Sequence, residues 1–316
     1  MLILLISAIF LGNSAYEAGN ITGAKIGIEQ IIGSKVIYFS GVDFLPIIIC
    51  LLISIIYLMG SSELIKKLLL FIVVLISFSF VFAAIITKPD VLSVLRGLFM
   101  PRFDLSELAL VISLIGTTIV PYNLFLHSAL VKKMSHEINY EQIKNDTIIS
   151  VSIGGLISFC IVLAAANSGL KSVESVSDLG IALSPIYGEF SKYLISIGLF
   201  GAGISSAITA PLAASYVVSE CFGWKIKGNK AKFIFLFVLV SGTIFSSLDI
   251  NPIVIIQLAQ LFNGLLLPII GVFLLLLVTS NKLKNYFNNQ YLIKIILTII
   301  LVSYMFLGLK NLGLFF

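Results

Sequence analysis

The run GTTIVPYNLFLHS, from Gly116 to Ser128, decides how this chain is interpreted. It lies inside an apolar stretch of about 105–131 but carries Pro121 near its centre. Proline removes a backbone N–H donor, and its ring clashes with the preceding turn of a helix. In a bilayer the freed carbonyls need other partners, and helices broken near the midplane can offer these oxygens to a cation. A plain proline kink, satisfied by a neighbouring helix, is the alternative on this spacing alone.

The composition around this run is that of a membrane protein. Of 316 residues, 59% are hydrophobic and 11% charged, whereas roughly a quarter of the residues in soluble proteins are charged. The mean hydropathy is +1.12. Such a chain is neither a soluble enzyme, nor disordered, nor a secreted disulfide scaffold. Because the apolar runs are continuous and do not alternate with polar residues, a membrane β-barrel is also excluded.

Apolar stretches of spanning length, about 20 residues each, predict an all-α polytopic fold with about nine transmembrane helices. They cover about 2–24, 43–60, 67–87, 105–131, 147–166, 191–218, 231–248, 251–279 and 290–310. The connections are short, so we expect one transmembrane domain over 1–316. We expect a polar surface segment at 132–146 and a loop at 167–190.

The basic residues predict the orientation. About 12 of the 20 lysines and arginines follow the second, fourth, sixth and eighth stretches, and positive loops stay in the cytoplasm. The N-terminus then starts inside, the C-terminus ends outside, and the chain is a multi-pass protein of the cytoplasmic membrane. Lys25 is assigned to an outer loop. The net charge of +5 therefore marks topology in a lipid bilayer, and no nucleic-acid partner is expected.

Glu17 is the one acidic residue well inside an apolar stretch. Asn13, Glu17 and Asn20 are spaced i, i+4, i+7 and share one helix face. An ionisable residue within a membrane is expensive, which makes a proton or cation relay the functional hypothesis. A protonated or snorkelling structural glutamate is the alternative.

Small residues predict where helices pack closely. Ala15, Gly19 and Gly23 form a small-xxx-small ridge on the face next to Glu17. The stretch from Gly201 to Ala214 is also rich in small residues, and we expect it to be an interior helix.

Two further apolar stretches carry side chains suited to an ion. His127 lies six residues past Pro121, about 9 Å along a helix, and histidine titrates near neutral pH. Gln260 and Asn263 precede Pro268, and amide oxygens are hard cation ligands. Structural hydrogen bonds are the alternative at each position. The chain has no P-loop, GxSxG, HExxH or dinucleotide fingerprint, so we expect no enzyme.

Three runs resemble helices of the natural-resistance-associated macrophage protein (NRAMP) family of divalent-metal transporters. GTTIVPYNLFLHSALV (Gly116–Val131) resembles the sixth helix, QLAQLFNGLLLPIIGVFLLLL (Gln257–Leu277) the tenth, and GNSAYEAGNITGAKIG (Gly12–Gly27) the third. The similarity covers essentially the whole chain. It implies a partial LeuT-type inverted-repeat fold, with 1–87 as the remainder of the first repeat, 105–280 as the second and 290–310 as an extra helix.

The resemblance also implies the site residues. The metal would be held by the carbonyl of Thr117 and by Gln260, with Val120 at the position of the family's methionine ligand. Glu17 and His127 would form the proton route, with Asn20 at the position of a second acid. The residues expected to line the site are Gly116, Pro121, Tyr122, Asn123, Asn20 and Asn263.

Two departures from the family pattern matter. The D-P-G-N motif of the family's first helix does not occur in the sequence. The expectation is therefore an N-terminally shortened chain, with a separate segment supplying two missing helices. Val120 also lacks the soft thioether that favours transition metals. In this respect the chain resembles an NRAMP-related branch that handles Mg²⁺ and Mn²⁺.

The interpretation is a secondary transporter of divalent cations of the Mn/Fe/Mg class, proton-coupled through Glu17 and His127. It needs no cofactor, since the metal is the substrate. Two alternatives remain. One is a LeuT-type transporter of an organic substrate such as an amino acid. The other is a non-transporting membrane remnant or partner-dependent subunit.

Overall fold

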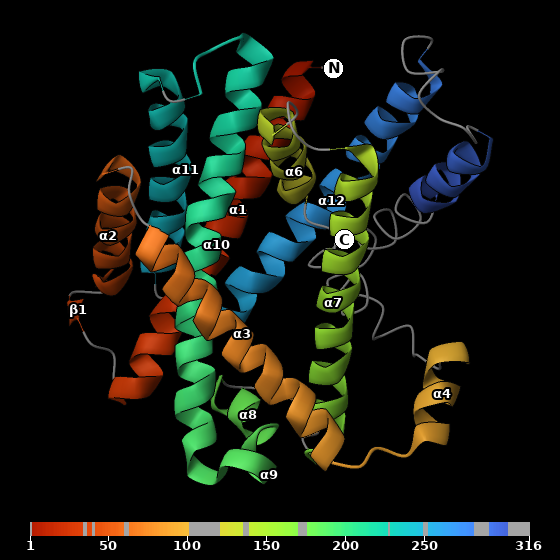
Figure 1. Ribbon diagram of the computed structural model, residues 1–316. Coiled ribbons are helices and arrows are strands. Elements are labelled where there is room, and N and C mark those ends of the chain that lie inside the picture. Colours follow the sequence, from red (N-terminus) through yellow and green to blue (C-terminus); the bar gives the residue numbers. More distant parts are fainter. Residues whose placement is uncertain are drawn as a thin grey trace, which may run out of the picture.

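A bundle of long helices makes up most of this computed structural model (Figure 1). The structure describes residues 2–33, 37–39, 42–59, 63–100, 121–134, 139–169, 176–226, 228–248, 252–280 and 291–302. The α-helices are α1 (Leu2–Ile32), α2 (Leu45–Met59), α3 (Glu63–Ile86), α4 (Val91–Phe99), α6 (Pro121–Met134), α7 (Tyr140–Ala166), α8 (Val176–Ile181), α9 (Ser184–Tyr187), α10 (Ser191–Phe222), α11 (Asn229–Ser247) and α12 (Pro252–Thr279). A 3-10 turn, η2 (Gly188–Phe190), joins α9 to α10. The antiparallel strands β1 (Tyr38–Phe39) and β2 (Val42–Asp43) precede α2.

The helices confirm the predicted polytopic membrane fold. Four described helical segments are long and apolar enough to cross a membrane: Leu69–Ile86, Tyr140–Ala166, Ser184–Phe222 and Asn229–Ser247. Shorter apolar helices cover Leu45–Met59, Pro268–Thr279 and Tyr291–Val302. The first predicted stretch lies in α1 but ends later, at Ile32. Of the fourth stretch, 105–120 lies outside the described residues, and the remainder is in α6.

One predicted connection is wrong in part, and another, 132–146, is mostly exposed where the structure describes it, as predicted, but helices extend into it. The polar segment 132–146 contains the end of α6 and the start of α7 at Tyr140. There the Asn139 backbone N–H donates to Gln142 Oε1 at 3.0 Å, part of a capping box. The predicted loop 167–190 contains α8, α9 and η2.

The short helix α4 was not predicted. Asp90 caps its N-terminus by accepting hydrogen bonds from Leu92 N at 3.3 Å and Ser93 N at 3.1 Å. The Ser93 hydroxyl donates to the same carboxylate. These bonds favour the charged form and lower the pKa of Asp90. A single carboxylate thus starts a helix in a connection where hydropathy gives no signal.

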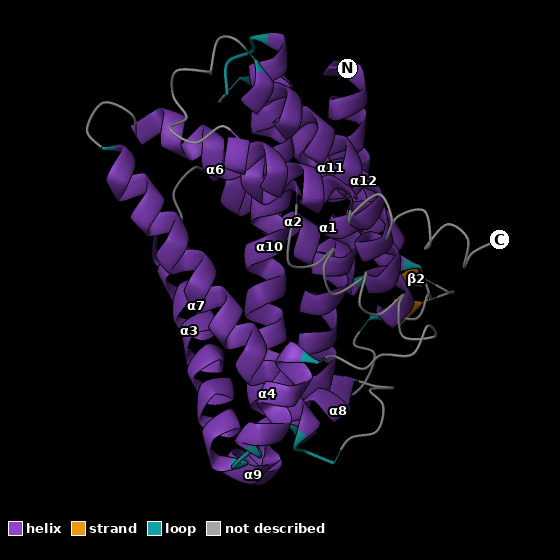
Figure 2. Ribbon diagram, turned by 90° about the vertical axis from the view of Figure 1, so that its right-hand side faces the viewer, coloured by secondary structure: helices purple, strands orange, loops and turns teal. Residues whose placement is uncertain are grey.

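The centre of the bundle is formed by α1, α10 and α11, with α10 crossing its middle (Figure 1). Of the apolar spanning windows, those in α10 and α11 are 44% buried and that in α7 is 11% buried. The small-residue stretch 201–214 is therefore interior, as predicted. Helices α3 and α7 lie side by side on one flank (Figure 2).

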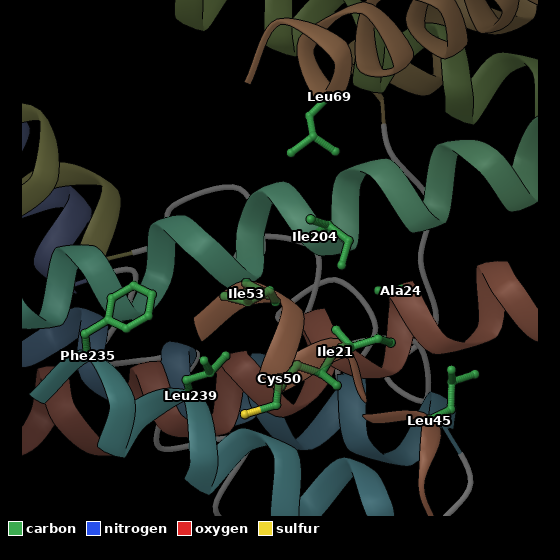
Figure 3. Close-up of a cluster of buried hydrophobic side chains, with 11 residues drawn as sticks. Ile21, Ala24, Leu45, Cys50, Ile53, Leu69, Ile204, Phe235 and Leu239 are labelled. Atoms are coloured by element: carbon green, nitrogen blue, oxygen red, sulfur yellow. The ribbon is translucent and has the colours of Figure 1, made fainter. Parts of the chain in front are cut away.

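A hydrophobic cluster fixes α2 against this centre. Figure 3 shows Ile53 and Cys50 of α2 between the central helices, close to Ile21 of α1 and Leu239 of α11. Ile21, Ile53 and Leu239 are completely buried. Tyr57 of α2 also stacks on Phe235 of α11, with ring centroids 3.6 Å apart. In lipid this contact depends on close packing, because lipid tails are as apolar as the side chains.

Glycines bring α1 and α10 into backbone contact. A Cβ at Gly203 would lie 2.5 Å from Ala24 N and 2.7 Å from Asn20 O. A Cβ at Gly27 would lie 2.5 Å from the Ser196 carbonyl oxygen. The predicted ridge was partly wrong: a Cβ at Gly23 would meet no atom within 4 Å. The close approach uses the buried face of α1, because Gly23 lies on a partly exposed face.

We predict that Gly203→Ala destabilises the fold by about 1–3 kcal/mol, because its methyl group forces two backbones apart. Thermal unfolding in detergent measures the effect. The matched control is Gly154→Ala in α7, where a Cβ meets nothing within 4 Å, and helix propensity alone should leave stability equal or higher. Equal melting temperatures for the two variants would contradict the prediction.

Candidate functional site

Glu17 lies at the junction of the central helices and is completely buried. The backbone of α11 passes directly over it, since a Cβ at Gly242 would lie 2.6 Å from both Cβ and Cγ of Glu17. Only glycine leaves room for the glutamate side chain at this contact. The sequence predicted an acid inside the membrane, and the structure confirms its burial. The role of Gly242 has no signal in the sequence.

The carboxylate of Glu17 has one bonded and one free oxygen. Asn20 Nδ2 donates to Glu17 Oε2 at 3.2 Å, and both side chains are on α1, as their spacing predicted. Glu17 Oε1 is buried without a hydrogen-bond partner among the described residues. An unsatisfied buried polar atom is costly, so this oxygen is suited to bind a proton, a water molecule or a cation.

Asn13 completes the predicted polar face and joins α1 to α10. It is 3% exposed, and its Nδ2 donates to the Ala210 carbonyl at 3.3 Å. The next residue, Pro211, is buried inside α10 and has no N–H to offer the preceding turn. The Asn13 side chain thus satisfies one backbone oxygen next to this proline, while α10 remains continuous.

A second polar contact joins α1 to α11. The hydroxyl of Thr22 donates to Ser246 Oγ at 3.0 Å, and both residues are completely buried. Neither was a predicted site residue, because isolated hydroxyls in apolar stretches carry no distinctive pattern.

Lys25 was wrongly assigned to an outer loop. It lies within α1, is 8% exposed, and its Nζ is 3.0 Å from Asp43 Oδ2. The other oxygen of Asp43 accepts the N–H of Leu45 at 3.0 Å and starts α2. Because Asp43 neutralises the ammonium group, α1 continues past a charge that would otherwise end a buried segment.

His127 contacts a different neighbour from Glu17. It is half-buried on α6, and its Nε2 lies 3.3 Å from the Thr147 hydroxyl of α7. The adjacent Leu126 packs against the buried pair Ala210 and Ala213 of α10, as does Tyr16 of α1. The structure thus gives His127 a partner on α7 and gives Glu17 its contacts on α1 and α11. The role of either residue in a proton route stays a prediction.

Most of the predicted metal site lies outside the residues and side chains that the structure describes. Gly116, Thr117 and Val120 lie outside the described residues. Pro121 and Tyr122 begin α6 and Gln260 and Asn263 lie on α12, but the structure describes none of these side chains. Asn123 is exposed on α6. Within the described part of the chain, no three His, Cys, Asp or Glu side chains gather into a metal-binding group.

The packing of the helices nevertheless brings predicted site elements together. Helix α12, which carries Gln260, packs along α1, which carries Glu17. Helix α6, which follows the predicted break, contacts α10, α12 and α1. The ligand positions stay a prediction; among the described elements, α12 with Gln260 is a neighbour of α1 with Glu17.

Comparisons with known proteins find similarity to one family of membrane proteins. The sequence profile of the family "Natural resistance-associated macrophage protein-like" matches residues 1–313. The chain is 26% identical over 300 residues to the Natural resistance-associated macrophage protein 2 homolog of Dictyostelium discoideum, covering 90% of this chain and 47% of that protein.

Bacterial transporters are identical to this chain to a similar degree. The divalent metal cation transporter MntH of Caldanaerobacter subterraneus is 25% identical over 70% of this chain and 54% of its own length. The protein of the same name from Bacillus subtilis is 28% identical over 68% of this chain and 51% of its own length. The chain thus spans about half the length of these relatives.

We predict that Asn20 and Glu17 are energetically coupled through their hydrogen bond. In a double-mutant cycle of Asn20→Ala and Glu17→Ala, the coupling energy should be about 0.5–3 kcal/mol, measured from unfolding in mixed micelles. The control cycle pairs Glu17→Ala with Asn13→Ala. Since Asn13 bonds the Ala210 carbonyl, its effect should add to that of Glu17→Ala. Additivity in the first cycle would show that the Asn20–Glu17 bond contributes nothing.

Proposed function

Because the chain belongs to the Natural resistance-associated macrophage protein-like family, we propose that it moves divalent metal cations across a membrane. The observation that carries this proposal is the completely buried Glu17, which has one carboxylate oxygen unpartnered among the described residues. A buried acid in a membrane helix is expensive to retain unless it serves an ion or a proton. MntH, to which the chain is similar, is named a divalent metal cation transporter.

The membrane concerned is the cytoplasmic membrane, with the lysine-rich connections inside. The N-terminus of α1 and the connection between α10 and α11 lie at the same end of the bundle (Figure 1). Lys230, in the first turn of α11, places its Nζ 4.8 Å from the centroid of the ring of Trp224 in that connection. Tryptophan and lysine together are typical of the membrane–water interface, which supports this end as an aqueous surface.

The cation is the substrate, and no resident cofactor is required. By resemblance, Thr117 supplies a backbone carbonyl and Gln260 an amide oxygen, with Val120 beside them. Oxygen ligands without a thioether favour hard ions, so we place Mg²⁺ and Mn²⁺ ahead of softer metals. The broken helix would present these ligands near the midplane, where alternating access exposes them to each side in turn.

Protons would provide the coupling. In its charged form Glu17 attracts a cation, and in its protonated form it is neutral and no longer does so. Asn20 holds one carboxylate oxygen at 3.2 Å, which leaves the other as the position where a proton is gained or lost. His127, by resemblance, takes the proton onward from α6.

We predict that Glu17→Gln removes the pH dependence of metal uptake, because glutamine keeps the hydrogen bonds but cannot bind a proton. Proteoliposomes containing the chain and an internal Mn²⁺-sensitive dye measure uptake at several external pH values. The matched control is Glu220→Gln, which removes an exposed acid that pairs with Lys132 on the surface. Unchanged pH dependence in Glu17→Gln would remove the acid from the mechanism.

We predict that Val120→Met raises the affinity for Cd²⁺ relative to Mg²⁺ by about tenfold or more, because a thioether is a soft ligand. Isothermal calorimetry on both proteins measures this ratio. A matched Val120→Leu variant separates the effect of sulfur from that of size. An unchanged ratio would mean that residue 120 does not face the ion.

A further inference from the structure

The ring of Trp224 is fixed closely at the end of α10. Gly223 ends this helix with a φ of 65°, and the Trp224 N–H then donates to the Ser219 carbonyl at 2.8 Å. This bond is typical of a Schellman cap, in which a glycine adopts the left-handed conformation. The Trp224 ring also stacks on Phe222, with ring centroids 4.9 Å apart. The indole is therefore held in the connection between α10 and α11, at the lysine-rich end of the bundle.

Lys230 brings a positive charge over this ring. Its Nζ lies 4.8 Å from the ring centroid, which is within the distance of a cation–π interaction. Four lysines occur in 225–232, and no acidic residue occurs in 221–248. The acid that precedes this stretch, Glu220, is paired with Lys132. Among the described residues, no ion pair neutralises Lys230, so the connection presents a concentrated positive charge.

An exposed apolar stripe runs along α11 from Lys230. Phe233, Phe237, Val240 and Ile244 follow it at spacings of three or four residues, so they share its helix face. All four side chains are between 44% and 64% exposed, whereas the other face of α11 is buried against α1, α2 and α10. At about 1.5 Å per residue the stripe is roughly 16 Å long, close to one leaflet of a hydrocarbon core about 30 Å thick.

The two rings at the head of this stripe are held in place by aromatic contacts. The ring centroids of Phe233 and Phe237 are 6.2 Å apart. Phe10 of α1 supports Phe237 from the side, with ring centroids 4.8 Å apart. Both separations are typical of favourable aromatic pairs. The surface beside Lys230 is therefore already formed, and a ligand that binds there orders few side chains.

We propose that this face, the Trp224–Lys230 pair with the stripe from Phe233 to Ile244, binds one anionic phospholipid. The ammonium group of Lys230 contacts the headgroup phosphate, and an acyl chain lies along the stripe. Clusters of lysines beside a membrane helix are typical of sites for anionic lipids. A zwitterionic headgroup carries a cation of its own, which the lysines of 225–232 repel. The inference uses the membrane fold of the chain and does not depend on the transport of a metal.

A second copy of the chain is the other occupant that an exposed apolar stripe could receive. In a two-fold contact the same patch of each copy meets its equivalent. Two copies with the same orientation in a membrane would then bring their lysine clusters together at one end. Like charges placed together at an interface are strongly unfavourable. The charge of 225–232 therefore favours a lipid over a second copy.

Trp224 is the only tryptophan of the chain, so its fluorescence reports on this face alone. The full chain is reconstituted in mixed bilayers of phosphatidylcholine and phosphatidylglycerol, with bromine near the headgroup end of the acyl chains of one lipid at a time. Bromine quenches a ring that it contacts, so the two series give the relative affinity of the face for the two lipids. We expect phosphatidylglycerol to be preferred about fivefold, the effect of one lysine near an anionic surface. High salt should reduce this preference.

Lys230→Gln should remove most of the preference, and Lys230→Arg, which keeps the charge over the ring, should retain it. The matched control is Lys225→Gln, which removes the same charge from the same connection but not from the head of the stripe, and it should keep most of the preference. Equal losses in Lys225→Gln and Lys230→Gln would overturn the proposal, because general attraction to a basic surface would then be sufficient. Equal quenching by the two lipids in the unmodified chain would also overturn it. So would the absence of quenching by either lipid, which is the result expected if a second copy covers α11.

Discussion

The burial of one carboxylate among three touching helices is the constraint on which the rest of the structure depends. Glu17 is completely buried because Gly242 lets the backbone of α11 cover it and Gly203 lets α10 approach α1. A bilayer offers no water to solvate this acid, so its partners must come from the protein. Asn20 supplies one hydrogen bond, and Asn13 ties the same face to α10. The tight packing of α1, α10 and α11 buries Glu17, and the polar side chains of this face bond Glu17 or join the helices, so the two properties depend on each other.

The structure separates this buried centre from a more exposed periphery. The spanning windows of α10 and α11 are 44% buried and that of α7 is 11% buried. Helix α6 meets α7 through the half-buried His127 and an exposed Thr147. A transporter of the proposed kind needs both properties, because alternating access moves one group of helices against another around a fixed site. The acid lies in the buried centre, and α6, the helix that follows the predicted break, packs against that centre on one side and meets α7 on the other.

Particular residues show how far sequence reasoning reached. The spacing of Asn13, Glu17 and Asn20 placed them correctly on one buried face, since helical periodicity needs no tertiary information. Lys25 was misplaced, because a charge near the end of an apolar stretch normally marks a loop, and only the fold brings Asp43 within 3.0 Å to neutralise it. Gly23 was chosen for close packing by its spacing, whereas Gly27 and Gly203 make the close contacts. Capping by Asn139 and Asp90, a local signal present in the sequence, sets helix starts that hydropathy missed.

The sequence by itself determined the membrane class, the approximate spans, the acid within α1 and the family resemblance, because hydropathy, periodicity and motif spacing are local properties of the chain. Tertiary structure alone decided which helix covers Glu17, that Thr22 meets Ser246, and that Lys25 is buried with a counter-ion. Each of these depends on residues more than 15 positions apart coming together. Such pairings are set by how helices dock, and a one-dimensional pattern cannot specify docking, since many faces of an apolar helix pack equally well against lipid or protein.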